Sequence, residues 1–184
     1  MFRSRFVSAA AFLTFAVLLL VFLTRAPEQA ITGPAHALDG DSIVVNGEEM
    51  RIRGMDAPEF RQTCQADGQH LPCGQRATAA MKRWLSRGPV YCYGSERDRY
   101  NRRLVLCRVN GVDIGRDLVI NGLAVDYGLY PEEEREAAAA QRGIWATTFE
   151  RPEDYRRRQR ESGEARGRPL SNSPGSARNN PARP

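Results

Sequence analysis

Apolar and polar residues follow two different periods along the chain, and the change of period separates predicted strands from predicted helices. Residues 42–45 and 49–53 flank Asn46-Gly47, a dipeptide typical of two-residue hairpins because both turn positions adopt a positive φ. Residues 90–94 and 104–109 form a second pair of predicted strands, joined by a polar turn. The pattern therefore indicates short strands and tight turns between residues 42 and 109.

Three further segments have the spacing of helices. The first presents one apolar face at positions i, i+4, i+7 and i+8. The residues on this face are Ala77, Met81, Trp84 and Leu85. Gly88-Pro89 ends this helix, residues 113–121 predict a second, and Pro131 begins a third that closes near Gly143. Together the elements favour an α+β fold, for which a five-stranded β-barrel of the OB type with three helices is one candidate.

The N-terminus carries a membrane signal. Residues 6–24 contain no charge and lie between Arg5 and Arg25, and the run approaches the roughly 20 apolar residues that span a bilayer. We expect residues 1–25 to form a transmembrane signal anchor, with a cleaved signal peptide as the alternative. The arginines before the run place the rest of the chain outside the inner membrane, so the folded domain is expected to be periplasmic, or secreted.

Composition divides the remainder into a linker (26–33), a folded domain (34–149) and an arginine-rich tail (150–184). From residue 151 onward the chain has nine arginines, four acidic residues and almost no large apolar side chains. Such a segment buries too little surface to fold alone, so we expect disorder beyond a helical start near residues 154–160. The tail is expected to hold nucleic acid or anionic lipid, or to be a solvated extension.

The four cysteines fit an exported chain, since an even count suggests two disulfides, although four cysteines allow three pairings. A symmetric hairpin between residues 90–94 and 104–109 places Cys92 opposite Cys107, within disulfide reach. Cys64 and Cys73 then close a local loop. The alternative is a zinc site formed by Cys64, His70 and Cys73, which lacks a fourth ligand and a recognised spacing.

Three polar clusters carry candidate chemistry. They are residues 39–42 (Asp-Gly-Asp-Ser), 51–59 (Arg-Ile-Arg-Gly-Met-Asp-Ala-Pro-Glu) and 98–104 (Asp-Arg-Tyr-Asn-Arg-Arg-Leu). Each alone has an ordinary structural explanation, as a turn, a strand exit or a solvated hairpin. Their order and spacing together are much harder to attribute to chance.

In this order the clusters resemble the staphylococcal nuclease family. The family pattern is Asp-Gly-Asp-Thr/Ser, then Arg-Leu-x-Gly-Ile-Asp-x-Pro-Glu, then Asp-x-Tyr-Gly-Arg. A later Gly-Leu-Ala segment and a helix ending in Gly-x-Trp are matched by residues 122–124 and 143–145. The resemblance covers about residues 34–146, and it implies an OB-type barrel that hydrolyses phosphodiester bonds with calcium.

The resemblance also assigns a metal site. Asp41 and Asp56 match the family's metal carboxylates, and a backbone carbonyl ligand falls at Ala57. Hard oxygen ligands completed by water suit Ca²⁺. We therefore expect Ca²⁺ as the cofactor, held by these three residues.

Three charged residues match the family's catalytic groups. Glu59 matches the residue that orients or deprotonates the attacking water. Arg51 and Arg102 match the two arginines that hold the phosphate, where guanidinium groups stabilise the charge of a five-coordinate transition state. Replacing any of the three is expected to lower turnover by several powers of ten.

Aromatic residues complete the expected site. Tyr100 matches a family tyrosine near the nucleotide, where stacking holds a base without sequence preference. Tyr127 and Tyr130 are weaker candidates. Asn101 stands where the family usually has glycine, and Arg103 adds a second cation beside the matched one.

These residues predict a monomeric, sugar-nonspecific endonuclease that acts on DNA and RNA, favours single strands and leaves 3′-phosphate ends. The alternative is a noncatalytic nucleic-acid-binding module, because a fold alone does not fix an activity. The acids Asp41, Asp56 and Glu59 would repel phosphate unless a cation sat among them, which favours the enzyme.

Overall fold

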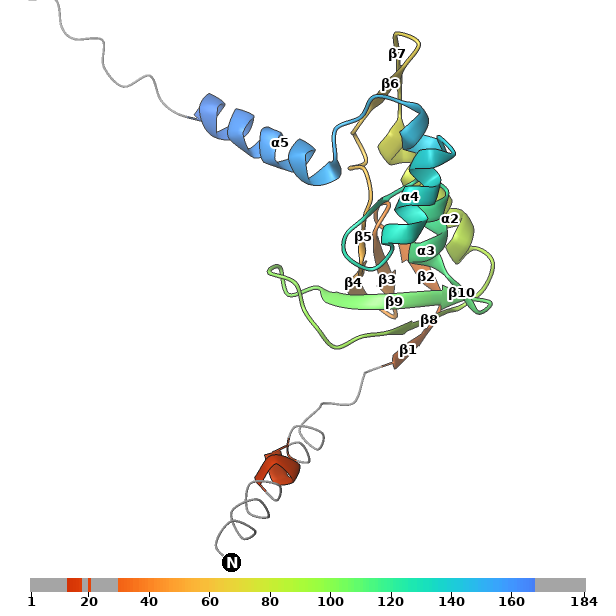
Figure 1. Ribbon diagram of the computed structural model, residues 1–184, viewed down its shortest axis with the longest axis vertical. Coiled ribbons are helices and arrows are strands. Elements are labelled where there is room, and N and C mark those ends of the chain that lie inside the picture. Colours follow the sequence, from red (N-terminus) through yellow and green to blue (C-terminus); the bar gives the residue numbers. More distant parts are fainter. Residues whose placement is uncertain (1–12, 18–19, 21–29, 168–184) are drawn as a thin grey trace, which may run out of the picture.

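The computed structural model describes residues 13–17, 20 and 30–167 (Figure 1). The strands are β1 (Ala30–Gly33), β2 (Ala35–Ala37), β3 (Ser42–Val45), β4 (Glu48–Ile52), β5 (Met55–Asp56), β6 (Cys64–Ala66), β7 (Gln69–Leu71), β8 (Val90–Tyr93), β9 (Arg103–Val109), β10 (Val112–Asp113) and β11 (Val125–Asp126). The helices are α2 (Cys73–Leu85), α3 (Ile114–Ile120), α4 (Pro131–Ala139) and α5 (Pro152–Gly167), with a short 3-10 helix η1 (Gly143–Ala146).

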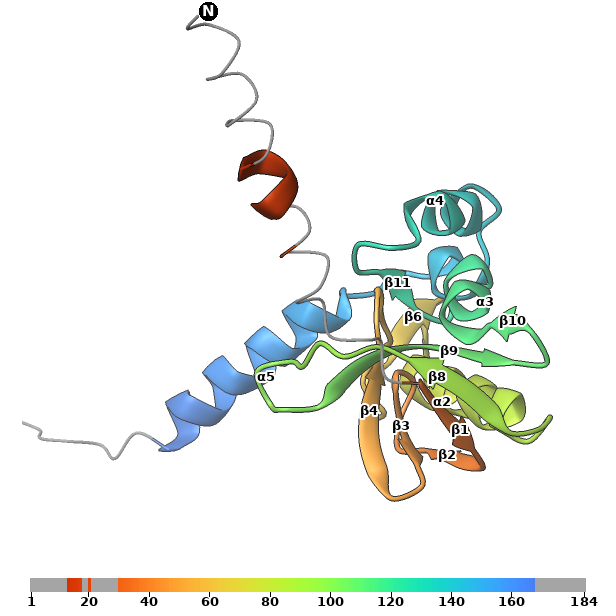
Figure 2. The ribbon, with the colours of Figure 1, turned by 90° about the horizontal axis from the view of Figure 1, so that it is seen from below.

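The main sheet has the order β1-β8-β9-β4-β3-β2, with β10 paired to β9. Its neighbours are antiparallel except β4 and β9, which are parallel. Figure 2 shows these strands crossing around a core rather than lying in one plane. The expected α+β class is therefore confirmed. The closed five-stranded barrel is not, because no pairing among the described residues joins β1 to β2 and further strands extend the sheet.

Both predicted hairpins form with the predicted register. Between β3 and β4, Asn46 and Gly47 have φ of 50° and 85°, as the two-residue turn requires. In the second hairpin, Cys92 of β8 lies opposite Cys107 of β9 and the two form a disulfide. The strand alternation alone thus located this disulfide correctly.

Loss of the Cys92–Cys107 disulfide is expected to destabilise the domain substantially. The bond joins two fully buried residues and closes a loop of 15 residues. A loop of that length contributes about 3 kcal/mol by restricting the unfolded chain. A Cys92→Ser/Cys107→Ser variant should therefore show about that decrease in the free energy of unfolding, measured by urea titration. A decrease below about 1 kcal/mol would mean that the hairpin is held without the bond.

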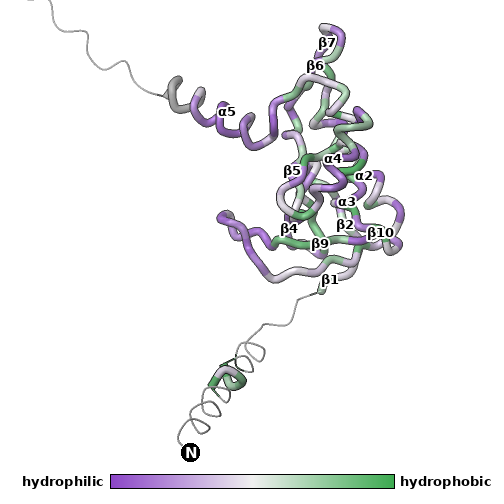
Figure 3. The backbone as a smooth tube through the Cα atoms, in the orientation of Figure 1, coloured by the Kyte–Doolittle hydropathy of each residue, from purple (hydrophilic) through white to green (hydrophobic). Residues whose placement is uncertain are grey.

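The helices close the core on one side of the sheet. The predicted apolar face of α2 is buried as expected. It packs with residues of β3, β4, β9 and α3 into one cluster, visible as green segments in Figure 3. Ile144 of η1 is also buried, in a second cluster with Cys64, Cys73 and Val125. The segment after α4 therefore packs against the domain.

The segment 59–74 is not the simple loop that its Gly, Pro and Asp content predicts. It contains the antiparallel pair β6–β7, turned at Asp67 and Gly68, which both have positive φ. The Asp-Gly dipeptide is a hairpin signal in its own right. Cys64 and Cys73 form a disulfide here, so the alternative zinc site is wrong.

The N-terminal segment is only partly described by the structure. The expected signal anchor, residues 1–25, lies largely outside the described residues, of which 13–17 and 20 are helical. No helix within the described part is long and apolar enough to cross a membrane.

The helical start expected near residues 154–160 is confirmed, but the disorder expected beyond it is wrong for residues 161–167, because α5 covers residues 152–167. Pro152 opens this helix, and Glu153 and Asp154 lie in its first turn, where carboxylates favour the positive end of the helix dipole. Arg157 pairs with Asp154 one turn away at 2.7 Å. The helix is thus stabilised by its ends and its ion pairs, which apolar content does not reveal. Residues 168–184 of the expected tail lie outside the described residues.

Candidate active site

Two buried carboxylates lie at the base of the candidate site. The turn before β3 is held by Asp39, whose Oδ1 accepts hydrogen bonds from the backbone N–H of Asp41 and Ser42. A Cβ at Gly40 would lie 2.6 Å from the Cβ of Ala57, so only glycine allows this close approach. As a result, Asp41 Oδ2 reaches the N–H of Ala57 at 3.3 Å.

Asp56 ends β5 and is paired with β11. Arg51 of β4 joins the two acids, because its Nη2 lies 2.7 Å from Asp41 Oδ2 and 2.6 Å from Asp56 Oδ1. Asp41 and Asp56 are only 3% and 1% exposed. Two carboxylates at such depth require cationic partners, since an unpaired buried charge is costly.

The electrostatics of Asp41 show how tightly balanced this pair is. Burial, opposed by the charge of Arg51 and supported by the charges of Asp39 and Asp56, raises the pKa of Asp41 to about 7. A carboxyl group whose folded pKa is raised adds stability at acid pH and loses that contribution as pH rises through the raised value. The site therefore favours an additional cation at neutral pH.

Arg102 is held at the mouth of the site by the β8–β9 turn. Its Nε and Nη2 lie 2.8 and 2.7 Å from Asp98 Oδ2, and Nη1 lies 3.3 Å from Ser42 Oγ. Asn101 has φ of 66°, so it adopts the left-handed conformation for which the family usually has glycine at this position. This turn directs the guanidinium of Arg102 toward the start of β3.

Asp98 is expected to contribute stability that depends on pH. Burial alone would raise its pKa, but hydrogen bonds from the side chain and N–H of Arg102 and from the N–H of Tyr100 outweigh burial and lower it. Because the folded pKa is lowered, the contribution is present above the unfolded pKa of about 3.9 and is lost as pH falls below it. Asp98→Asn should therefore lower the free energy of unfolding at pH 7 by about 1–2 kcal/mol.

Urea titrations of Asp98→Asn at pH 7 and at low pH measure this effect. The difference from wild type should shrink as the pH falls toward 2–3, where Asp98 becomes protonated. Glu96→Gln is a matched control in the same turn, since Glu96 is exposed and makes a 3.3 Å pair with Arg53. A pH-independent loss in Asp98→Asn would assign the effect to turn geometry rather than to charge.

Glu59 follows β5 in a short, tightly held turn. Its N–H donates to Gln62 Oε1 at 3.1 Å, and its carbonyl accepts from the N–H of Gln62 at 2.7 Å. Gln62 is 1% exposed, so the turn is fixed from inside the domain. The carboxylate of Glu59 is left at the surface of the site, where Oε1 lies 2.9 Å from Arg156 Nη1 of α5.

These groups surround one cleft of about 870 Å³ between the β8–β9 turn and the N-terminal half of α5. Its lining includes Arg51, Glu59, Tyr100, Arg102 and Tyr127. Tyr100 and Tyr127 are 64% and 63% exposed, so their ring faces are open to a ligand. The cleft thus combines several arginines and carboxylates with two accessible aromatic rings.

The structure brings most of the predicted site residues together and separates the others. Asp41, Asp56 and Ala57 are buried beneath the residues that line the cleft. Tyr130, by contrast, is 6% exposed and hydrogen-bonds Asp113, so its weaker candidacy was wrong. Arg103 turns away to Glu48 at 3.1 Å, whereas Arg99 and Arg102 of the same turn both line the cleft.

Sequence reasoning missed the residues that α5 contributes. Glu153, Arg156 and Arg160 line the cleft. Arg156 Nη2 lies 2.8 Å from Asp56 Oδ2, and its Nη1 lies 3.0 Å from Asp56 Oδ1. No motif marks these residues, and composition predicted only a short helical start near residues 154–160, with no place in the site.

The donor set fits a hard divalent cation. Asp41 and Asp56 offer carboxylate oxygens at one point, with the backbone of Ala57 beside them. Within the described residues, no group of three or more His, Cys, Asp or Glu side chains converges on one metal position. Two carboxylates and a carbonyl therefore leave room for several waters, an arrangement that Ca²⁺ accepts and that thiolate-binding metals do not favour.

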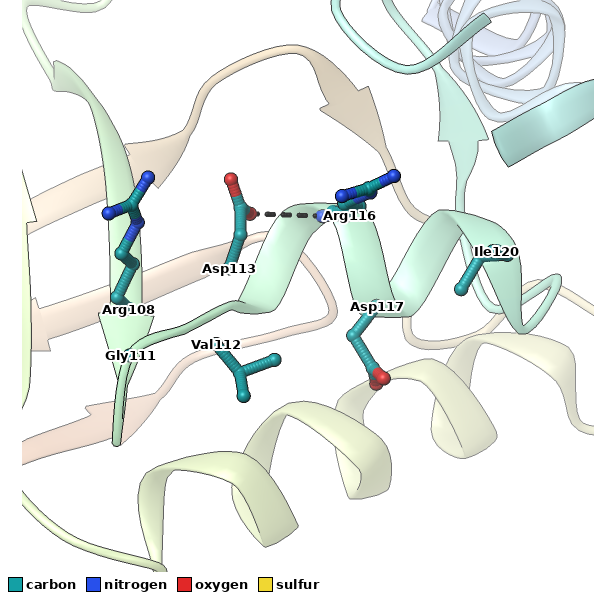
Figure 4. A pocket seen from close by; sticks show the side chains of 7 residues that line it. All are labelled: Arg108, Gly111, Val112, Asp113, Arg116, Asp117 and Ile120. Carbon is teal, nitrogen blue, oxygen red and sulfur yellow. Dashed lines mark hydrogen bonds between the residues drawn. The ribbon is translucent and has the colours of Figure 1, made fainter. Parts of the chain in front are cut away.

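A second hollow, lined by residues of β9, β10 and α3, does not offer comparable chemistry. It is lined by Arg108, Gly111, Val112, Asp113, Arg116, Asp117 and Ile120 (Figure 4). Its acids already have structural partners, since Asp113 caps the N–H of Arg116 and Asp117 accepts from Trp84 Nε1 at 2.7 Å. The cleft at Arg51 is therefore the stronger candidate.

Comparison with known proteins gives one family. The family model described as staphylococcal nuclease homologue matches residues 49–147. That range contains Arg51, Asp56, Glu59 and Arg102, but neither Asp41 nor α5.

Individual relatives agree over a similar length. The chain is 36% identical over 125 residues to succinoglycan biosynthesis protein ExoI of Rhizobium meliloti, covering 64% of this chain and 65% of that protein. It is 31% identical over 153 residues to Endonuclease YhcR of Bacillus subtilis, covering 70% and 13%. It is 30% identical over 127 residues to "Probable staphylococcal-like nuclease CAN2" of Oryza sativa, covering 65% and 32%. The chain thus spans less than two thirds of each of these relatives.

Proposed function

The chain belongs to the staphylococcal nuclease homologue family, and on that premise we propose that it is a metal-dependent endonuclease that hydrolyses phosphodiester bonds. The observation that carries this proposal is the arrangement of the cleft. Arg51 and Arg102 are among the arginines that line it, the carboxylate of Glu59 lies beside α5, and the two buried acids contact Arg51. Other relatives are named as nucleases.

Each residue has a distinct part in the proposed reaction. Arg51 and Arg102 bind the phosphate and stabilise the charge that develops on its oxygens. Glu59 accepts a proton from the attacking water, and the bond from phosphorus to the 5′-oxygen breaks, which leaves a 3′-phosphate and a 5′-hydroxyl. Asp41, Asp56 and the carbonyl of Ala57 would hold Ca²⁺. When bound, the ion supplies Lewis-acid polarisation of the phosphate.

The geometry supports an enzyme better than a noncatalytic binding module. A module that only binds phosphate has no use for acids beside its arginines, since they repel the ligand. Here Asp41 and Asp56 are buried against Arg51 at 2.7 and 2.6 Å, and burying them is costly. A cost of this kind is expected where the acids serve a cation.

The substrate and setting extend the same proposal. Tyr100 and Tyr127 have exposed rings that suit stacking on unpaired bases, so we propose single-stranded DNA and RNA as favoured substrates, without sugar preference. The curved sheet and the helices α2, α3 and α4 support a fold of the OB type in which the barrel is not closed. Two disulfides and the arginine-flanked apolar run support a monomer that acts outside the cytoplasm, anchored in the membrane or secreted.

Digestion and binding assays on the same sample distinguish the two functions. The purified, oxidised full chain is incubated with single-stranded DNA or RNA in Ca²⁺, in Mg²⁺ or in chelator. The enzyme predicts cutting of both polymers in Ca²⁺, 3′-phosphate ends and no cutting in chelator. Retention of DNA on a gel without cutting in either metal, by a folded sample, would establish the binding module instead.

A further inference from the structure

Helix α5 places a cation of the protein itself in the acidic part of the cleft. Arg156 makes three contacts there, to both carboxylate oxygens of Asp56 at 2.8 and 3.0 Å and to Glu59 Oε1 at 2.9 Å. Asp56 is 1% exposed, so these contacts take up oxygens that few other groups can reach. The helix lies outside residues 49–147, the part of the chain that the family model matches.

The start of α5 is attached to the domain at several points. The side chain of Gln62, which also fixes the turn of Glu59, donates to the carbonyl of Glu150 at 2.7 Å. Arg151 pairs with Glu134 of α4 at 3.0 Å, and Pro152 is buried. Arg156 is therefore delivered to the acids by a segment that is connected to the Glu59 turn itself.

Among the described residues of α5, none belongs to either apolar cluster of the domain. Figure 3 shows α5 as one of the most hydrophilic parts of the tube, and Figure 1 shows it extending away from the domain. Arg157 and Arg158 pair only with Asp154 and Glu150, close to the helix itself. Because little apolar surface is buried, a competing cation can displace Arg156 without breaking the core.

Arg156 and a divalent cation require the same oxygens. Burial of the guanidinium acts to lower its pKa, but the hydrogen bonds to Asp56 and Glu59 outweigh burial and raise it, so Arg156 stays charged. Arg156 donates to both oxygens of Asp56, one of which also accepts from Arg51, so a metal ion could take both oxygens only by displacing Arg156. The contact to Glu59 also ties up the proposed proton acceptor. The two cations therefore exclude one another.

We propose that α5 is an intramolecular strap, in which Arg156 competes with the metal ion for Asp56 and with the attacking water for Glu59. The strap sets the metal concentration at which the cleft becomes active, so that the chain is closed at low Ca²⁺ and opens when Ca²⁺ displaces Arg156. This inference rests on the proposed metal-dependent function.

Calcium titration of the full chain by calorimetry tests the strap independently of cutting. Arg156→Ala should bind Ca²⁺ about tenfold more tightly than wild type, because the closed form no longer reduces the competent fraction. Arg157→Ala is the matched control, since it removes the same charge from the same helix without a contact in the cleft. Its Kd should remain within about twofold of wild type, which separates the contact from net charge.

Limited trypsin digestion supplies a second readout. In wild type, saturating Ca²⁺ should accelerate cleavage after residues 156–160, while in Arg156→Ala the cleavage should be fast with or without Ca²⁺. Equal Ca²⁺ affinity in wild type and Arg156→Ala, with Ca²⁺ bound in both, would overturn the strap and leave the proposed nuclease intact. Absence of Ca²⁺ binding in every folded variant would overturn both.

Discussion

Arg51→Ala is expected to lower the rate of phosphodiester cleavage by about 10³–10⁵-fold, the range seen for arginines that stabilise a transferring phosphoryl group. Arg51 lines the cleft and is the only described cation within 3 Å of both Asp41 and Asp56. Removing Arg51 therefore takes away the positive charge that stabilises both the phosphate and the two buried acids. Single-turnover cleavage of a labelled oligonucleotide in saturating Ca²⁺ measures the first effect.

The same substitution should also destabilise the chain without metal. Removing one partner of a buried ion pair costs about 3–5 kcal/mol, and Arg51 serves two carboxylates. The loss should grow as pH rises through 7, because the raised pKa of Asp41 lets that group become neutral below that value. Saturating Ca²⁺ should recover part of the stability, since the ion binds only the folded state.

Arg116→Ala is the charge-matched control for Arg51→Ala. Arg116 is 64% exposed and pairs with Glu133, away from the cleft. The Arg116→Ala variant should cut nucleic acid at close to the wild-type rate, and Ca²⁺ should not need to recover any lost stability. Wild-type cleavage by a folded Arg51→Ala chain would remove Arg51 from the phosphate-binding role.

Glu59→Gln is expected to lower cleavage by about 10²–10⁴-fold, the usual contribution of a general base. Glutamine keeps the shape of the side chain and its hydrogen bond to Arg156, but it cannot accept a proton from water. The turn is fixed by the backbone of Glu59 and by Gln62, so the fold and the binding of nucleic acid should be unchanged. The expected signature is thus a loss of kcat with KM preserved.

Glu153→Gln is the control for Glu59→Gln. Glu153 lines the same cleft, and its substitution removes a similar negative charge without removing a contact to Asp56 or Arg156. It should leave kcat within about a factor of three, as expected for an exposed charge that acts only through the field of the protein. Equal losses in both variants would indicate a field effect and would exclude proton transfer to Glu59.

The regular elements were predictable because each one has a local cause. Asn46-Gly47 specifies the β3–β4 turn, and the alternation of β8 and β9 sets the register that unites Cys92 with Cys107. The cleft was predictable in a different way. Arg51, Glu59 and Arg102 were identified by a family motif, and the fold then placed all three on one surface.

The rest depended on contacts that no local pattern encodes. Arg156 lies 100 residues from Asp56 in the chain, and its helix is hydrophilic, so composition indicated a short helical start but no contact with the domain. The burial of Tyr130 depends on its contact with Asp113, 17 residues away. The β6–β7 hairpin was concealed for a different reason, because its Asp-Gly turn lies within a run of other loop-forming residues.

A crystal structure of the full chain with Ca²⁺ and a short single-stranded oligonucleotide tests the proposed metal and phosphate sites most directly. The ion is located by its anomalous scattering. We expect Ca²⁺ to be bound by Asp41, Asp56 and the carbonyl of Ala57, and a backbone phosphate to be contacted by Arg51 and Arg102. Calcium bound elsewhere, or a phosphate held without these two arginines, would contradict this expectation.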